Sequence, residues 1–81
     1  MSTPAQHPPS QVTFPRYDLT GRELEMLELA SRDMSNKAIA KAQQTTEQVI
    51  KNRWHREVFR KMKVSNRAAA VAKALREGLI K

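Results

Sequence analysis

The chain has 81 residues and contains no cysteine. A chain of this length can hold one domain with a small core. Without thiols it forms neither disulfides nor thiolate metal sites, which is typical of an intracellular protein. The apolar runs are only a few residues long and no apolar block follows a basic start, so we expect neither a membrane span nor a secretory signal.

The net positive charge of the chain is confined to the second half of the sequence. Residues 1–45 carry five basic and five acidic side chains, whereas residues 46–81 carry ten basic and three acidic ones and so hold the whole formal net charge of +7. This distribution favours a polyanionic partner, and nucleic acid is the first candidate. The alternative is that the basic helices simply form a solvated surface.

Residues 1–16 predict a disordered tail, or an interdomain linker if the chain is part of a larger protein. Their prolines stand among Ser, Thr and Gln without apolar periodicity. The folded domain is therefore expected over residues 17–81.

Two helices are expected first in this domain. Thr20 and Glu23 have the spacing of a capping box ahead of an apolar stripe, which predicts a helix that ends near residue 32. Ser35 then caps a second helix, whose buried face is Ile39 and Ala40. The second helix is short because four polar residues follow at 43–46.

Two more helices complete the pattern, and no strand is predicted. Thr46 caps a long third helix over about 46–62, which carries most of the charge. Its apolar residues are Ile50, Trp54, Val58, Phe59 and Met62. Ser65 or Asn66 opens an Ala-rich fourth helix, and Gly78 supplies the left-handed residue that ends it. The sequence therefore predicts an all-α, four-helix fold.

The second and third helices have the spacing of a helix-turn-helix. A short helix, a turn of three or four residues and a longer basic helix form the unit that inserts its second helix into the DNA major groove. Ala40 is small where the helices approach, Gln44 lies in the turn, and Ile50 lies on the inner face of the second helix.

Here the chain resembles the C-terminal DNA-binding domain of LuxR-type regulators, over about residues 19–80. The motifs that carry the resemblance are Leu19-Thr20-Gly21-Arg22-Glu23, Ser35-Asn36-Lys37-Ala38-Ile39-Ala40, Val49-Ile50-Lys51-Asn52, Arg60-Lys61-Met62-Lys63-Val64 with Asn66-Arg67, and Gly78-Leu79-Ile80. The resemblance implies a four-helix fold, sequence-specific operator binding and homodimerisation through the last helix.

Three departures from the family pattern lead to structural expectations. Gln43 and Thr45 stand where the family has buried aliphatic residues, which predicts a less tightly anchored turn. Asp33 replaces a Gly after the first helix, and Asp tolerates the left-handed region. The stretch from Lys51 to Val64 has one residue more than the family pattern, and the usual His after Lys-Asn is replaced by Arg.

The extra residue predicts a local deformation of the third helix. One residue turns an α-helix by about 100°, so an undistorted helix would continue the inner face with Glu57 and Lys61, which is costly in a core. A π-type turn between about residues 51 and 58 would return Val58 and Met62 to the inside, with Trp54 mostly buried and Glu57 exposed.

The candidate site residues follow from this helix-turn-helix assignment. The expected base contacts are Gln48, Lys51, Asn52 and His55. The expected phosphate contacts are Lys37, Thr46, Arg53, Arg56, Arg60 and Lys61. For each of them the alternative is an ordinary solvated surface. The lone imidazole of His55 has no second ligand nearby, so no metal and no cofactor is expected.

The small residues of the fourth helix have two explanations: Ala favours helix formation by itself, or small side chains allow a second copy of the chain to pack closely. With the resemblance, they predict a dimer interface that comprises Ala69, Val71, Ala72 and Arg76.

Two functions from different classes remain open. The first is a dimeric, sequence-specific DNA-binding transcription regulator in the bacterial cytoplasm, associated with the nucleoid when bound. The second is a protein-binding antagonist that pairs with a full-length LuxR-type regulator and blocks it. No nucleophile, base and orienting group stand at useful spacings, so we do not expect an enzyme.

Overall fold

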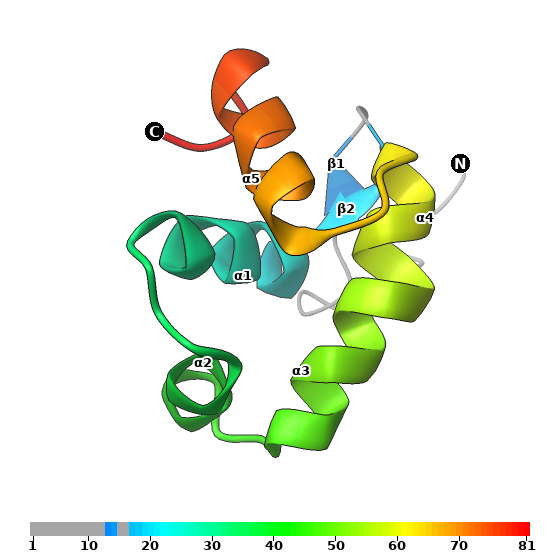
Figure 1. Ribbon diagram of the computed structural model, residues 1–81. Helices are drawn as coiled ribbons and strands as arrows, with labels where there is room; N and C mark the ends of the chain where they lie inside the picture. Colours follow the sequence, from blue (N-terminus) through cyan, green and yellow to red (C-terminus); the bar gives the residue numbers. More distant parts are fainter. Residues whose placement is uncertain (1–12, 15–16) are drawn as a thin grey trace, which may run out of the picture.

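The computed structural model describes residues 13–14 and 17–81. The expected tail at residues 1–16 lies outside the described residues, except for Thr13 and Phe14. The described elements are β1 (Thr13–Phe14), β2 (Leu19–Thr20), α1 (Gly21–Ser31), α2 (Asn36–Ala42), α3 (Glu47–Arg53), the π-helix η2 (Trp54–Val58), α4 (Phe59–Met62) and α5 (Arg67–Arg76). Since α3, η2 and α4 form one continuous rod, the predicted four-helix fold is confirmed (Figure 1). None of the helices in the described part is long and apolar enough to cross a membrane.

The expectation that no strand would form is wrong. β1 and β2 pair antiparallel, with Thr13 opposite Thr20 and Phe14 opposite Leu19. Two residues per strand are too few to show the alternation that predicts a strand. The connection is closed by Tyr17 and Asp18, both of which have a positive φ.

All four helices begin at the predicted type of residue. The N-caps are Thr20, Ser35, Thr46 and Asn66, and each side chain accepts a hydrogen bond from a backbone N–H three residues later. Thr20 and Glu23 form the complete capping box. These caps satisfy backbone donors that have no partner inside the helix.

The helices also end in one common way, with a left-handed residue. These residues are Asp33, Gln44, Lys63 and Gly78. At each end, two backbone N–H groups return to carbonyls of the last turn, as Gly78 does to Leu75 and Leu79 does to Ala74. This is the Schellman arrangement. The predicted roles of Asp33 and Gly78 are confirmed.

One apolar core lies between the helices. α1 packs against α2 and α5, and α2 packs against α3. The largest fully buried side chains are Trp54, Leu19, Met26, Leu27, Ile39, Ile50, Met62 and Val58. Figure 1 shows the rod rising along one side of the molecule, with α2 beside its start and α5 near its end.

The predicted deformation of the third helix is confirmed. The helix widens into a π-helix at Trp54–Val58, and the N–H of Phe59 donates to the carbonyl of Trp54, five residues back. Val58 and Met62 are fully buried, Trp54 is 2% exposed, and Glu57 is exposed. The wider turn accommodates the extra residue and keeps the apolar side chains inside.

The turn before β2 is attached to the last helix and to the residue that caps its end. The hydroxyl of Tyr17 donates to Oε1 of Glu77 over 2.7 Å. The amine of Lys73 lies 5.1 Å from the centre of the Tyr17 ring and donates to the carbonyl of Met62 over 2.8 Å. Lys73 therefore links the end of α4 to α5 and to the turn before β2.

Candidate nucleic-acid interface

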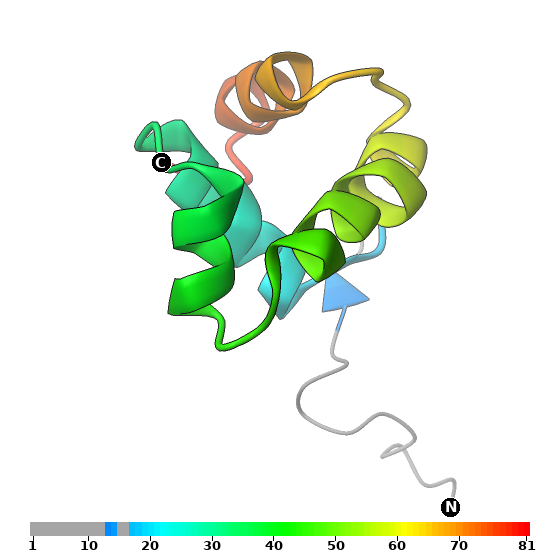
Figure 2. The ribbon, with the colours of Figure 1, turned by 60° about the horizontal axis from the view of Figure 1, so that its bottom comes forward.

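The helix-turn-helix unit is formed by α2, a turn over 43–46 and α3. Figure 2 shows α2 and the start of α3 in front, joined by this turn. Ala40 is buried where the helices meet, Gln44 adopts the left-handed conformation, and Ile50 is fully buried. The predicted assignment of these three residues is therefore confirmed.

Along the rod formed by α3, η2 and α4, side chains four positions apart stay on the same side, because the wider turn of the π-helix offsets the narrower α-helical turns around it. The inner row is Ile50, Trp54, Val58 and Met62, all of them buried. The outer row, two positions away along the chain, is Gln48, Asn52, Arg56 and Arg60, all of them exposed. In a regular α-helix of 3.6 residues per turn, such rows would drift around the axis.

The outer row presents polar and basic groups to solvent. Nε2 of Gln48 donates to Oδ1 of Asn52 over 3.2 Å, so these two amides lie side by side. Within the described part of the chain, the guanidinium groups of Arg56 and Arg60 have no hydrogen bond or ion pair. Their donors are therefore free for a ligand.

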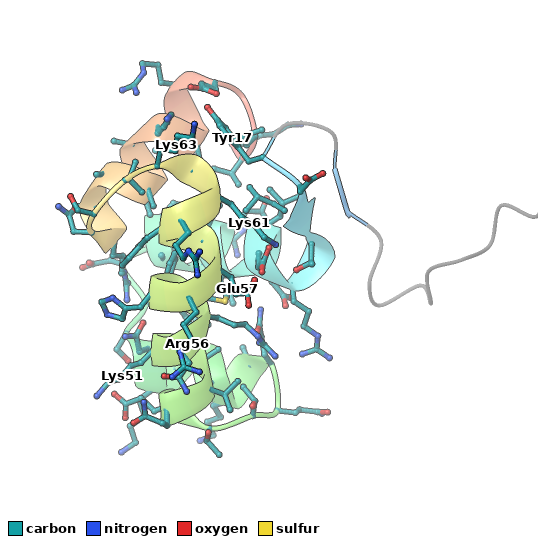
Figure 3. The ribbon with its side chains drawn as sticks, turned by 90° about the vertical axis from the view of Figure 1, so that its right-hand side faces the viewer. Tyr17, Lys51, Arg56, Glu57, Lys61 and Lys63 are labelled. Carbon is teal, nitrogen blue, oxygen red and sulfur yellow. The ribbon has the colours of Figure 1, made fainter. Side chains whose placement is uncertain are left out.

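Lys51 and His55 form the neighbouring row on one flank of the rod, and both are exposed. They line a small groove with Asn36 at the start of α2 and Ser65 before α5. The imidazole of His55 meets the ring of Phe59 edge-on, with 5.2 Å between ring centres. Figure 3 shows Lys51 on one side of the rod, Arg56 toward the viewer and Glu57 on the other side.

Basic residues on the opposite flank are turned toward the protein. Nη1 of Arg53 donates to Oε1 of Gln43 over 2.9 Å. The amine of Lys61 donates to Oε1 of Glu23 over 2.8 Å and lies 3.8 Å from Glu57. Both side chains are partly buried. Arg53 and Lys61, which the sequence predicted as phosphate contacts, are therefore held by internal acceptors, unlike the exposed Arg56 and Arg60.

The expectation of a loosely anchored turn is wrong. Gln43 is only 3% exposed, and its amide Nε2 donates to the carbonyl of Arg22 and to Oε1 of Glu25. Its own backbone carbonyl accepts a hydrogen bond from Nη1 of Arg22 over 2.9 Å. With the bond from Arg53, these contacts join α1, the turn and α3. Because every polar atom here has a partner, the amide replaces aliphatic packing without an unsatisfied group.

The remaining expected phosphate contacts lie at helix starts. Lys37 is exposed in the first turn of α2. Thr46 is exposed, and its Oγ1 accepts a hydrogen bond from the N–H of Val49. Its hydroxyl proton is still available, because the capping bond uses only the oxygen.

Trp54 is a core residue, as expected, and it also fixes the rod. Its indole Nε1 donates to Oδ1 of Asn36 over 2.9 Å. Nη1 of Arg67 donates to the same oxygen over 3.1 Å, and the guanidinium lies 5.9 Å from the centre of the Trp54 ring. Nη2 of Arg67 also donates to the carbonyl of Met34. The side chains of Asn36, Trp54 and Arg67 thus connect the loop before α2, α2 itself, η2 and α5.

The outer face of α5 is an apolar groove beside α1. Its lining includes Ala30, Ala68, Val71, Ala72 and Leu75. Two of the four predicted interface residues, Val71 and Ala72, line it, whereas Ala69 and Arg76 do not. Sequence reasoning missed Leu75, although it is 46% exposed and stands four residues after Val71. This spacing is the signal that could have found it.

Groups of three or more His, Cys, Asp or Glu residues that could hold a metal ion do not occur in the part of the chain that the structure describes. The fold and the exposed basic row define a helix-turn-helix protein of the nucleic-acid-binding class.

Comparison with known proteins agrees with this class. The family model described as "Bacterial regulatory proteins, luxR family" matches residues 18–74. The chain therefore belongs to the luxR family, whose domain serves DNA-binding transcription regulation. It is 34% identical over 71 residues to the HTH-type transcriptional regulator AlkS of Alcanivorax borkumensis. The alignment covers 86% of this chain but 8% of AlkS. No solved structure matches the chain.

Proposed function

We propose that residues 17–81 bind DNA in a sequence-specific manner, with α3 in the major groove. The observation that carries this proposal is the exposed side of α3 and of the first turn of η2, where four polar or basic side chains are free of the core. These proposed base contacts are Gln48, Lys51, Asn52 and His55, all of them exposed. Lys can bond guanine, and Asn or Gln can pair with adenine through two hydrogen bonds.

The backbone contacts are proposed at both ends of this surface. Lys37 and Thr46 stand in the first turns of α2 and α3, near the backbone amides of the helix starts. Arg60 lies two turns after Asn52 on the exposed row of the rod, and no partner of its guanidinium lies among residues 13–14 and 17–81. The net charge of +7 favours such phosphate contacts.

We further propose that two copies pair through α5, with Val71, Ala72 and Leu75 at the centre of the interface. The support is an apolar groove with a half-exposed leucine, which a twofold mate can cover. Ala69 and Arg76 then lie at its margin. A dimer presents two α3 helices to two half-sites on DNA, as a transcription regulator in the bacterial cytoplasm requires.

Fluorescence anisotropy with labelled duplex DNA tests the proposal. If about five phosphates are neutralised per protomer, the logarithm of the affinity falls with the logarithm of salt at a slope of about −4 to −5. The substitutions Lys51→Ala and Asn52→Ala should each cost about 1–3 kcal/mol on a selected site and much less on random DNA. Arg32→Ala, at an exposed position after α1, is the control.

A lack of binding at low salt would contradict this function. The chain would then have to be tested as an antagonist that pairs with a larger LuxR-type regulator, by measuring whether it releases that regulator from DNA.

A further inference from the structure

We infer that Arg56 reads a guanine base and thereby adds a further position to the sequence preference of this domain. The inference rests on the proposed DNA binding. From the sequence alone, Arg56 is expected to contact phosphates. In the structure it lies on the same exposed side of the rod as Gln48 and Asn52, which are proposed to face the bases.

The first observation is the position of Arg56 in the outer row. The inner row advances by four residues through Ile50, Trp54 and Val58, all of them buried. Side chains two positions away must therefore point in the opposite direction at the same spacing, and Arg56 stands four residues after Asn52. Figure 3 shows Arg56 projecting outward between Lys51 and Glu57.

This position depends on the π-helix. In a regular α-helix, a step of four residues exceeds one turn by about 40°. The drift from Gln48 through Asn52 would then continue, and the next side chains would turn toward the flank where Arg53 and Lys61 are held by internal acceptors. The wider turn at Trp54–Val58 cancels this drift for Arg56.

The second observation is the state of the guanidinium. Among the basic side chains of the rod, Arg53 donates to Gln43 and Lys61 donates to Glu23. In the described part of the chain, Arg56 has no such partner, although it is exposed beside Asn52 and Glu57. All five N–H donors of its fork therefore remain available.

Distance along the rod distinguishes Arg56 from Arg60. A helix rises about 1.5 Å per residue, so Arg56 lies about 6 Å beyond Asn52 and Arg60 about 12 Å beyond it. Base pairs are about 3.4 Å apart, so Arg56 lies within about two base-pair steps of Asn52 when the row follows the groove. The long, planar Arg side chain can reach O6 and N7 of guanine with two hydrogen bonds.

Selection from a pool of randomised duplexes tests this inference, with wild type, Arg56→Lys, Arg56→Ala, Arg60→Lys and Arg60→Ala. Arg56→Lys keeps the charge but lacks the fork. Because Lys can still bond guanine, we expect it to weaken the preference for guanine at one position of the selected site, with an unchanged salt dependence, whereas Arg56→Ala should abolish this preference. Arg56→Ala should weaken the selected site about 5- to 150-fold and random DNA only slightly. Arg60→Lys should select the same sites as wild type.

The outcomes separate the two proposals. If wild type binds DNA but Arg56→Ala selects the same bases and weakens all duplexes by one factor, then Arg56 is a phosphate contact and the inference is wrong. If wild type binds no duplex, the proposed function itself fails, and the inference fails with it. Unfolding midpoints equal to wild type check that the variants are folded.

Discussion

Lys61 and Glu23 stand 38 positions apart in the sequence, yet the amine of Lys61 donates to the carboxylate of Glu23 over 2.8 Å. The same oxygen also accepts the N–H of Thr20 in the capping box. One buried carboxylate therefore completes the start of α1 and holds the far end of the rod. Charge-assisted hydrogen bonds of this kind are stronger than neutral ones.

We predict that Lys61→Ala lowers the free energy of unfolding by about 1–3 kcal/mol, because it leaves the buried carboxylate of Glu23 without its cation. Urea denaturation measures this change. Arg60→Ala is the matched control, since Arg60 is exposed and should change stability by less than about 0.5 kcal/mol. Equal stability of the two variants would show that the ion pair contributes nothing.

The amide of Gln43 should be necessary for the turn. Replacement of Gln43 by Leu keeps the volume but removes the acceptor of Arg53 Nη1 and the amide that donates to the Arg22 carbonyl and to Glu25. We expect a loss of about 1–3 kcal/mol in thermal unfolding. Gln44→Asn, at an exposed left-handed position, should have little effect. A stabilised Gln43→Leu variant would mean that aliphatic packing outweighs the hydrogen bonds here.

Replacement of the left-handed residue after α4, Lys63, by glycine should increase the stability of the domain. Lys63 has a φ of 58° and is exposed, and a non-glycine residue in this region is strained. Lys63→Gly should therefore stabilise the domain by about 0.5–1 kcal/mol, whereas Lys63→Ala should not. Conversely, Gly78→Ala should destabilise it by about 1 kcal/mol through backbone strain alone, because nothing lies within 4 Å of the added methyl group. Thermal denaturation of the three variants measures both the expected gain in stability for Lys63→Gly and the expected loss for Gly78→Ala.

Deletion of Glu57 should convert the rod into a regular α-helix. The inner residues would then follow the 3.6-residue period, since Val58 and Met62 each move one position closer to Ile50 and Trp54. We expect stability within about 1 kcal/mol of wild type, and amide exchange or NMR should show no π turn. Deletion of Glu25 from regular α1 is the control, because it rotates Met26 and Leu27 away from the core. Unfolding of the Glu57 deletion variant would contradict this account.

Local features of the fold could be predicted from the sequence. The N-caps, the residue that ends α5 and the inner row depend on positions within one turn of each other, and the extra residue predicted the π-helix because Glu57 and Lys61 are poor core residues. These inferences need only helix geometry and the cost of burying charge.

Contacts between distant elements could not be predicted in this way. Arg53 and Lys61 were assigned to phosphates because their type suits DNA, but their acceptors, Gln43 and Glu23, lie on other elements. Only the packed arrangement brings each donor to its acceptor. The short β-pairing and the exposure of Leu75 likewise depend on how the elements meet.

The π-helix also bears on how the exposed surface of this rod can vary. Insertion or deletion of one residue in a helix usually rotates everything beyond it and so damages the core. Here the π-helix absorbs one residue while Ile50, Trp54, Val58 and Met62 all stay buried. A length change in this helix therefore acts like several substitutions of exposed side chains made at once, while the buried side chains keep their places.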